Sequence, residues 1–189
     1  MENIIINAIN RHKESIKFVE ENIAILNDIS LRCVETIKNK GKIIFMGNGG
    51  SAADAQHLAA EFIGRFKKKR QPLPAIAISS NISVITAIGN DFGYEEIFSY
   101  QIEALAQIKD LVFAISTSGK SKNLINAILK AKDKGTYTIG LLGKDGGELK
   151  NLVDTSLIIP IEDTARIQEM HILIGHIICQ IVEEELFNE

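Results

Sequence analysis

The chain has 189 residues, a length that suits a single domain over residues 1–189, and its 46% hydrophobic and 24% charged residues predict a packed core. A formal net charge of −3 argues against nucleic acid as a partner, because proteins that bind it usually carry a basic patch or stripe. No apolar run is long enough to span a membrane and the N-terminus lacks the pattern of a signal peptide, so we expect a cytoplasmic protein without membrane contacts.

The N-terminal segment, residues 1–40, is predicted to be helical from about residue 3. Asp28 or Ser30 is expected to divide it into two helices, and Gly41 is expected to end it as a C-cap glycine. The helical spacing is carried by Ile16, Val19, Ile23, Leu26, Ile29, Cys33 and Ile37.

Short apolar runs then alternate with amphipathic stretches. The runs are continuous, as in strands that are covered on both faces, and the alternation predicts a parallel sheet with helices on both sides. The predicted strands span residues 43–46, 75–78, 111–115, 137–142 and 157–159. The predicted helices span about residues 51–65, 81–88, 94–107 and 121–134.

Residues 163–187 are predicted to form one long C-terminal helix with an apolar face. Because both terminal helical segments exceed what one sheet needs for cover, we expect them to build an oligomer interface. Cys33 and Cys179 lie far apart in helical patterns, which favours two buried thiols over a disulfide.

Ligands of an open α/β sheet bind beyond the carboxyl ends of its strands, and polar clusters follow several of the predicted strands. In the loop of residues 47–51, glycines permit close approach to a ligand and Ser51 is placed to cap the next helix, although a plain turn explains this loop equally well. Residues 116–121 carry four hydroxyls directly before a helix, a pattern that favours a phosphate site over a simple cap.

Three further clusters have two interpretations each. Asn90 and Asp91 suit either sugar hydroxyls or a turn. The basic run of residues 67–70 suits a solvated surface loop better than a rim that attracts an anionic substrate. His57 and Glu61 share one face of a helix, and become candidates for metal binding or acid–base chemistry only if partners converge on them. Possible partners on the last helix are Gln168, Glu169, His171 and His176.

Six segments in this order carry motifs that can be compared with known families: residues 47–57, 61–66, 89–93, 116–121, 143–147 and 164–169. Together they resemble the phosphoheptose isomerases, a family of the SIS (sugar isomerase) fold that acts on sedoheptulose 7-phosphate. The match extends over nearly the whole chain, whereas the Ser-Thr-Ser-Gly loop alone would indicate only the fold.

The resemblance implies a flavodoxin-like three-layer α/β/α sandwich with a parallel five-stranded sheet, assembled as a homotetramer with active sites at subunit interfaces. It implies that substrate is bound by Asn48, Gly49, Gly50, Ser51, Glu61, Asn90, Asp91 and Gln168, and its phosphate by Ser116, Thr117, Ser118 and Ser121. It also implies a zinc ion held by His57, Glu61, Gln168 and His176.

The implied reaction converts sedoheptulose 7-phosphate to D-glycero-D-manno-heptose 7-phosphate, the first step of activated heptose biosynthesis for bacterial lipopolysaccharide or capsule. Glu61 is the expected base and His176 the expected acid, with zinc polarising the carbonyl group. Some members carry aspartate where this chain has Ala165, which puts one secondary contact in doubt.

One geometric difficulty concerns the implied zinc ligands. Gln168 and His176 are eight residues apart, roughly 12 Å along a helix axis. A break in the helix, or ligands from different subunits, would resolve it. His171 lies nearer to Gln168 on the helix face, and a structural role is the alternative for that residue.

Two other functions are compatible with the same fold. A non-catalytic SIS adaptor or sensor, such as a relative that associates with the replication initiator, lacks the acid–base pair that this chain keeps in Glu61 and His176. An isomerase for another sugar phosphate, such as arabinose 5-phosphate, typically carries an added regulatory module, which we do not expect here because the predicted single domain accounts for residues 1–189.

Overall fold

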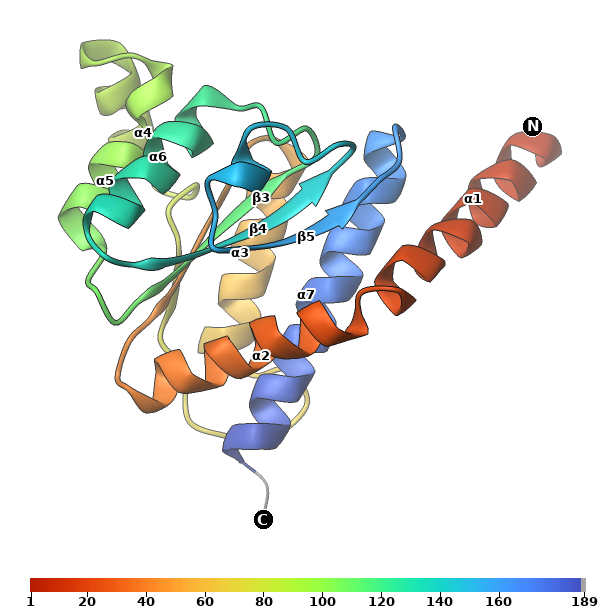
Figure 1. Ribbon diagram of the computed structural model, residues 1–189, viewed down its shortest axis with the longest axis horizontal. Coiled ribbons are helices and arrows are strands. Elements are labelled where there is room, and N and C mark those ends of the chain that lie inside the picture. The colour runs from red at the N-terminus through yellow and green to blue at the C-terminus, as the bar shows by residue number, and fades with distance from the viewer. Residues whose placement is uncertain (188–189) are drawn as a thin grey trace.

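The computed structural model describes residues 1–187 and has a parallel sheet of five strands between two layers of helices (Figure 1). The strand order, β2-β1-β3-β4-β5 with every neighbouring pair parallel, is the flavodoxin-like order. The predicted three-layer α/β/α architecture is therefore confirmed. The strands are β1 (Ile43–Gly47), β2 (Ala75–Ala77), β3 (Leu111–Ser116), β4 (Tyr137–Gly143) and β5 (Thr155–Ile159).

The helices within residues 1–187 fall close to the predicted ranges. The main difference is that residues 94–107 form a short 3-10 helix and a short α-helix rather than one continuous helix. The helices are α1 (Glu2–Glu20), α2 (Ile23–Lys38), α3 (Gly50–Ile63), α4 (Ile82–Asp91), η1 (Tyr94–Glu96), α5 (Ser99–Leu105), α6 (Lys122–Asp133), η2 (Leu149–Asn151) and α7 (Thr164–Leu186).

The central strands are buried on both faces. In β1, Ile43 and Phe45 pack into a core shared with α2, α3 and α7, whereas Ile44 and Met46 pack into a second core shared with α5 and α6. Since successive residues of a strand point to opposite faces, a strand with a core on each side must be apolar throughout. This explains why the strands are visible in the sequence as continuous apolar runs.

The boundary between α1 and α2 differs from the prediction. The helices separate at Asn22, whose side-chain amide donates to the Phe18 carbonyl oxygen at 2.7 Å and so replaces a helical backbone bond. Ser30 and Asp28 both lie inside α2, and the Ser30 hydroxyl donates to the Leu26 carbonyl oxygen at 2.8 Å. The expectation of a break at Asp28 or Ser30 was wrong.

The end of α2 is also made differently from the prediction. Lys40, not Gly41, takes the left-handed conformation, with φ of 59°. The Gly41 N–H donates to Thr36 and the Lys40 N–H to Ile37, the pattern of a Schellman motif. Gly41 is needed for a different reason, because a Cβ atom there would collide with the Lys109 carbonyl oxygen.

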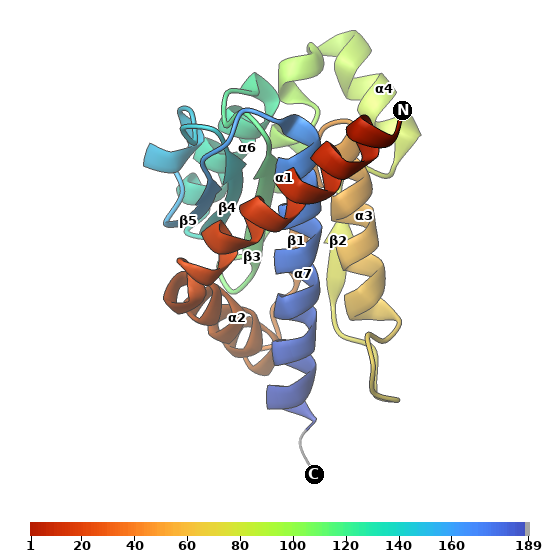
Figure 2. The same cartoon turned by 90° about the vertical axis from the view of Figure 1, so that its right-hand side faces the viewer.

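Helices α3 and α7 lie side by side (Figures 1 and 2), and they carry the candidate metal-binding residues His57, Glu61, Gln168 and His176. Helix α7 is unbroken, as predicted, and Asp163 caps its start by accepting from the Ala165 N–H at 3.0 Å. At Gly175 the two helices touch so closely that a Cβ atom would collide with the Leu58 side chain.

Helix α1 projects from the body of the molecule, and its N-terminal end lies farthest from the sheet (Figure 1). Its first turns expose a row of isoleucines, Ile4, Ile5, Ile6 and Ile9. None of the helices within residues 1–187 has both the length and the hydrophobicity to cross a membrane.

The two cysteines are free and buried, as predicted. Burial raises the pKa of Cys33 well above its ordinary value, and burial together with the nearby Glu61 raises that of Cys179 to about 12. Both thiols therefore stay protonated and unreactive at neutral pH.

Candidate active site

The loops that follow β1 and β3 are neighbours in space. The two strands pair in parallel, with Gly47 opposite Ile115, so both loops leave the same edge of the sheet. The strand order reverses between β1 and β3, and ligands of this architecture bind at such a switch point.

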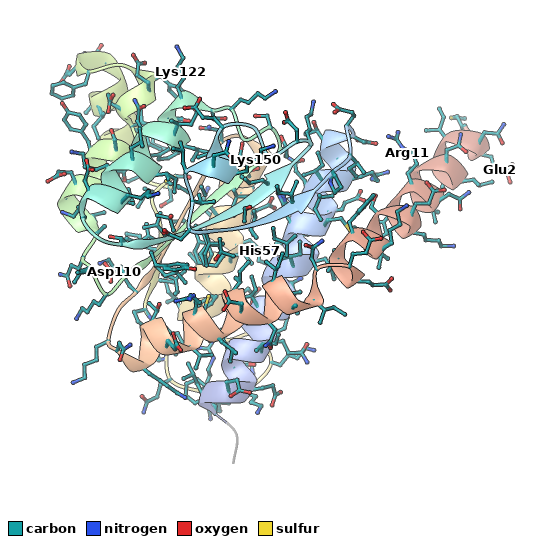
Figure 3. All side chains as sticks on the ribbon, viewed as in Figure 1. Glu2, Arg11, His57, Asp110, Lys122 and Lys150 are labelled. Atoms are coloured by element: carbon teal, nitrogen blue, oxygen red, sulfur yellow. The ribbon has the colours of Figure 1, made fainter. Side chains whose placement is uncertain are left out.

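A small cavity of about 60 Å³ lies between these two loops. Helix α6 begins directly beside it at Lys122, which is labelled in Figure 3, with Ser121 as its N-cap residue. The Ser121 side chain makes no capping bond to the helix, so its hydroxyl is available to a ligand. The lining residues are Asn48, Ser51, Ile115, Ser116, Thr117, Ser118, Ser121 and Leu124.

The hydroxyls of the loop after β3 have different tasks. Ser116 Oγ accepts from the Gly119 N–H at 3.0 Å, and Ser118 Oγ accepts from the Lys120 N–H at 3.3 Å. These two bonds fold the loop around Gly119, whose φ is 64°. The positive end of the α6 dipole and the neutral hydroxyl donors together make the cavity suitable for an anion such as phosphate.

Ser51 does not cap α3, contrary to expectation. Gly49, with φ of 55°, is the N-cap residue, and Ser51 lies inside the first turn of the helix. Its side chain is buried and forms part of the wall of the cavity. Ser51 is therefore placed as a ligand contact rather than as a helix cap.

Asn48 is held by two residues, Asn123 and Tyr94, that no sequence motif marks as part of a site. Its amide exchanges two hydrogen bonds with the amide of Asn123 in α6, both of 2.9 Å, and it accepts a third from the Tyr94 hydroxyl at 3.0 Å. Asn123 is buried. The loop after β1 is thus tied to both α6 and η1.

His57, Glu61 and His176 form a cluster between α3 and α7; His57 is labelled in Figure 3. His57 Nε2 lies 3.1 Å from His176 Nε2 and 3.2 Å from Glu61 Oε1. Ligands at 2.0–2.1 Å from a tetrahedral zinc ion lie about 3.3 Å apart. These two separations match such a site, and the N/N/O donor set could hold a metal ion.

The electrostatics of this cluster favour neutral imidazole at His176. Burial and the neighbouring His57 lower the pKa of His176, and Glu61 only partly offsets them. One helical turn before His57, burial raises the pKa of Asp54 despite the opposing effect of His57. A neutral imidazole is the form that can bind a metal or accept a proton.

Gln168 lies away from this cluster. It packs against the start of α3, where a Cβ atom on Gly50 would collide with its amide. Since α7 is continuous, a break in the helix does not bring Gln168 to His176. Within one chain, Gln168 is placed beside the loop after β1 instead.

Three other candidates from the sequence lie outside the cluster and the cavity. Asn90 and Asp91 are exposed in the last turn of α4, where the Asn90 amide donates to Asp91 Oδ1 at 2.7 Å. His171 is buried, and its ring nitrogens make no well-aligned hydrogen bond, although the Leu142 backbone lies close to the ring. Burial lowers its pKa to about 4, more than the nearby Leu142 backbone raises it, which favours a structural role.

In the basic run of residues 67–70, Lys67 and Lys69 are exposed, as the preferred interpretation of a surface loop expects, but Arg70 departs from it. The Arg70 side chain is 2% exposed and donates through Nε to Glu183 Oε1 at 2.8 Å. Burial would raise the pKa of Glu183, but the N–H groups of Phe66, Lys67 and Lys68, together with Arg70, outweigh that effect and lower it. No short motif in the sequence links Arg70 to Glu183.

Comparison with known proteins agrees with this geometry. Residues 7–143 match the family model described as the SIS domain. A phosphoheptose isomerase from Aliarcobacter butzleri is 52% identical over 187 residues, which cover 98% of this chain and 99% of that protein. One from Nitratiruptor sp. is 57% identical over 155 residues, covering 82% of this chain and 83% of that protein.

The chain is also similar to solved structures of phosphoheptose isomerases. The phosphoheptose isomerase of Neisseria gonorrhoeae superimposes with a TM-score of 0.87 at 37% identity, covering 96% of this chain and 99% of that one. The identity and coverage of these relatives are high enough to establish membership. The chain is therefore a SIS-domain protein of the phosphoheptose isomerase family, an enzyme of the sugar-phosphate isomerase class.

Proposed function

We propose that this enzyme interconverts sedoheptulose 7-phosphate and D-glycero-D-manno-heptose 7-phosphate. The observation that carries the proposal is that His176 of α7 meets Glu61 and His57 of α3 in one cluster, and that α3 begins at the serine-lined cavity. A carboxylate and an imidazole at this distance are the acid–base pair that an aldose–ketose isomerisation needs. The names of the relatives supply the seven-carbon substrate.

In the proposed mechanism, the cavity between Asn48 and Ser121 binds the phosphate and thereby orients the sugar. Glu61 removes a proton from the carbon beside the carbonyl group and returns it to the neighbouring carbon. His176 transfers the accompanying proton between the two substrate oxygens. Because Glu61 Oε1 faces His57, the second carboxylate oxygen is the one left for the substrate.

We propose that His57, Glu61 and His176 hold a zinc ion, with Gln168 reaching it from another subunit. When bound, the ion would supply Lewis-acid polarisation of the substrate carbonyl group. Gly49, Gly50, Ser116, Thr117 and Ser118 would contact the substrate from the two loops. Asn90 and Asp91 would reach it only from a neighbouring copy.

A homotetramer is part of the proposal. An apolar groove of about 340 Å³ lies between α1, α2 and α7, and the exposed isoleucines of α1 extend beyond it. Two such surfaces on one chain suit association of several copies. We place the enzyme in the cytoplasm, at the first step of activated heptose biosynthesis for lipopolysaccharide or capsule.

The test is conversion of sedoheptulose 7-phosphate by wild-type protein, Glu61→Gln and His176→Gln, each after chelation and after zinc is restored. We expect zinc-dependent turnover in wild type and losses of about 10²- to 10⁴-fold in both variants. Glu148→Gln, an exposed change of the same kind, serves as the control and should retain full activity.

Two outcomes would contradict the proposal. Turnover of five- or six-carbon sugar phosphates alone would assign a different substrate. Absence of turnover with any sugar phosphate, in folded and zinc-loaded wild type, would favour a non-catalytic binding protein.

A further inference from the structure

An ion pair at the far end of α3 and α7 connects directly to the residues of the cluster. Arg70 and Glu183 join through Nε and Oε1 at 2.8 Å, and both side chains are 2% exposed. The pair is therefore shielded from water, unlike the surface ion pairs elsewhere in the chain. We refer to these two side chains as the Arg70–Glu183 clamp.

Arg70 holds the end of the helix that carries Glu61. Its Nη2 donates to the Glu61 carbonyl oxygen at 2.8 Å, and its Nη1 donates to that of Phe62 at 2.9 Å. These carbonyl groups belong to the last turn of α3, where a helix leaves its acceptors unsatisfied. Gly64, which follows the helix, has φ of −77° and does not form a left-handed cap; Arg70 instead binds the Glu61 carbonyl oxygen and shares that of Phe62 with the Leu73 N–H.

Glu183 holds the segment that covers His176. Its carboxylate accepts from the N–H groups of Phe66, Lys67 and Lys68 at 3.1, 2.7 and 2.8 Å. The ring of Phe66 packs on the ring of His176, with centroids 5.4 Å apart and an interplanar angle of 36°. Because Glu183 and His176 lie on the same helix, Glu183 fixes Phe66 relative to that imidazole.

We propose that the Arg70–Glu183 clamp is a positioning pair for the isomerase reaction, which sets Glu61 and His176 at the separation that metal binding and proton transfer require. This inference rests on the proposed function. Neither side chain touches the phosphate cavity, so the clamp acts on the chemical step and not on capture of the phosphate. A guanidinium fork is needed because one group must serve Glu183 and two helix carbonyls together.

The test compares Arg70→Lys and Glu183→Gln with wild type. Lysine keeps the charge but cannot reproduce the fork, and glutamine keeps the shape but places an amide among N–H donors. We expect kcat to fall about 10-fold or more with KM within about twofold, and zinc affinity without substrate to fall about 10-fold. Arg32→Lys is the control, because Arg32 stacks on Tyr137 at 4.2 Å and pairs with Asp28 of its own helix α2 rather than with α3 or Glu183.

Each protein is measured at a temperature at which circular dichroism shows it fully folded. The inference would be overturned if folded Arg70→Lys and Glu183→Gln kept the kcat and zinc affinity of wild type. It would also be overturned if the loss of kcat followed the unfolded fraction, or if Arg32→Lys showed the same loss. An increase in KM as large as the decrease in kcat would also overturn it. Absence of turnover in wild type would refute the proposed function instead, and the zinc affinities would then decide the positioning role alone.

Discussion

Asn123 is the residue on which the geometry of the loop after β1 depends most directly. It is 2% exposed and makes both of its amide hydrogen bonds to Asn48. In Asn123→Ala, Asn48 keeps only the Tyr94 hydroxyl as a partner. We expect KM for the sugar phosphate to rise several-fold and the free energy of unfolding to fall by about 1–3 kcal/mol.

The control for this prediction is Asn126→Ala, one turn later on α6. Asn126 donates to Glu95 and Glu96 and not to the substrate loop, so its loss should leave KM unchanged. Steady-state kinetics and chemical denaturation measure the two effects. An unchanged KM in Asn123→Ala would show that Asn48 does not need this support.

His171 makes stability depend on pH. Its pKa is about 4 in the folded chain against about 6.5 when unfolded, so between these values the unfolded state binds more protons. The stability that neutral, buried His171 contributes is fully present above about pH 6.5 and is lost as the pH falls towards 4. This amounts to about 3 kcal/mol between pH 7 and pH 4.

The measurement is the free energy of unfolding of wild type and His171→Leu from urea titrations at pH 7, 5.5 and 4. The difference between the two proteins should change by about 3 kcal/mol over this range, because leucine does not titrate. A constant difference would mean that His171 is already protonated, or has a partner, in the folded protein.

At the scale of single residues, the sequence predicted what local spacing determines and missed what only packing determines. His57 and Glu61 could be selected together because a separation of four residues places them on one helix face. Asn123, Arg70 and Glu183 could not be selected, since each is a polar residue of ordinary kind in its own segment. Their roles come from contacts with segments far away in the chain.

The loop between β3 and α6 is the element whose shape leaves least freedom. Gly119 has φ of 64°, and a Cβ atom there would collide with the Gly146 carbonyl oxygen in the loop after β4. We expect Gly119→Ala to separate the two loops, with loss of phosphate binding and a lower melting temperature. Calorimetric titration with inorganic phosphate and thermal melting provide the readouts.

Gly135→Ala separates backbone strain from collision. Gly135 has φ of 71°, yet its nearest neighbour would be the flexible Ile108 side chain at 3.3 Å. Gly135→Ala should therefore lower the free energy of unfolding only by the left-handed strain of about 1–2 kcal/mol, and the variant should retain phosphate binding. If both variants bind phosphate equally well, the contact between the loops does not shape the cavity.

At the scale of elements, all five strands were predictable because each contains a continuous, mostly apolar run, and the central strands are covered by helices on both faces. Helix ends were less predictable. Asn22 and Lys40 end their helices through a side-chain bond and a left-handed lysine, and neither feature has a pattern in the sequence distinct from a helix interior. The pairing of α3 with α7 depends on Gly175, which nothing in the sequence marks as a contact.

For the whole molecule, the apolar groove between α1, α2 and α7 predicts self-association. Ile23, on its rim, is 66% exposed in the single chain. Ile23→Arg places a charge in the proposed interface, so we expect a smaller species in analytical ultracentrifugation. Ile82→Arg, on α4 and 74% exposed, is the matched control and should sediment like wild type. Identical sedimentation of all three proteins would exclude the groove as an interface.

The phosphate cavity and the His57–Glu61–His176 cluster are built on different supports. Loops at the edge of the sheet form the cavity, whereas side chains of α3 and α7 form the cluster, and neither Glu61 nor His176 lines the cavity. Recognition and turnover can therefore be lost separately during evolution. After gene duplication, substitutions at Glu61 and His176 alone would convert one copy into a receptor that still senses the sugar phosphate, with its architecture already complete.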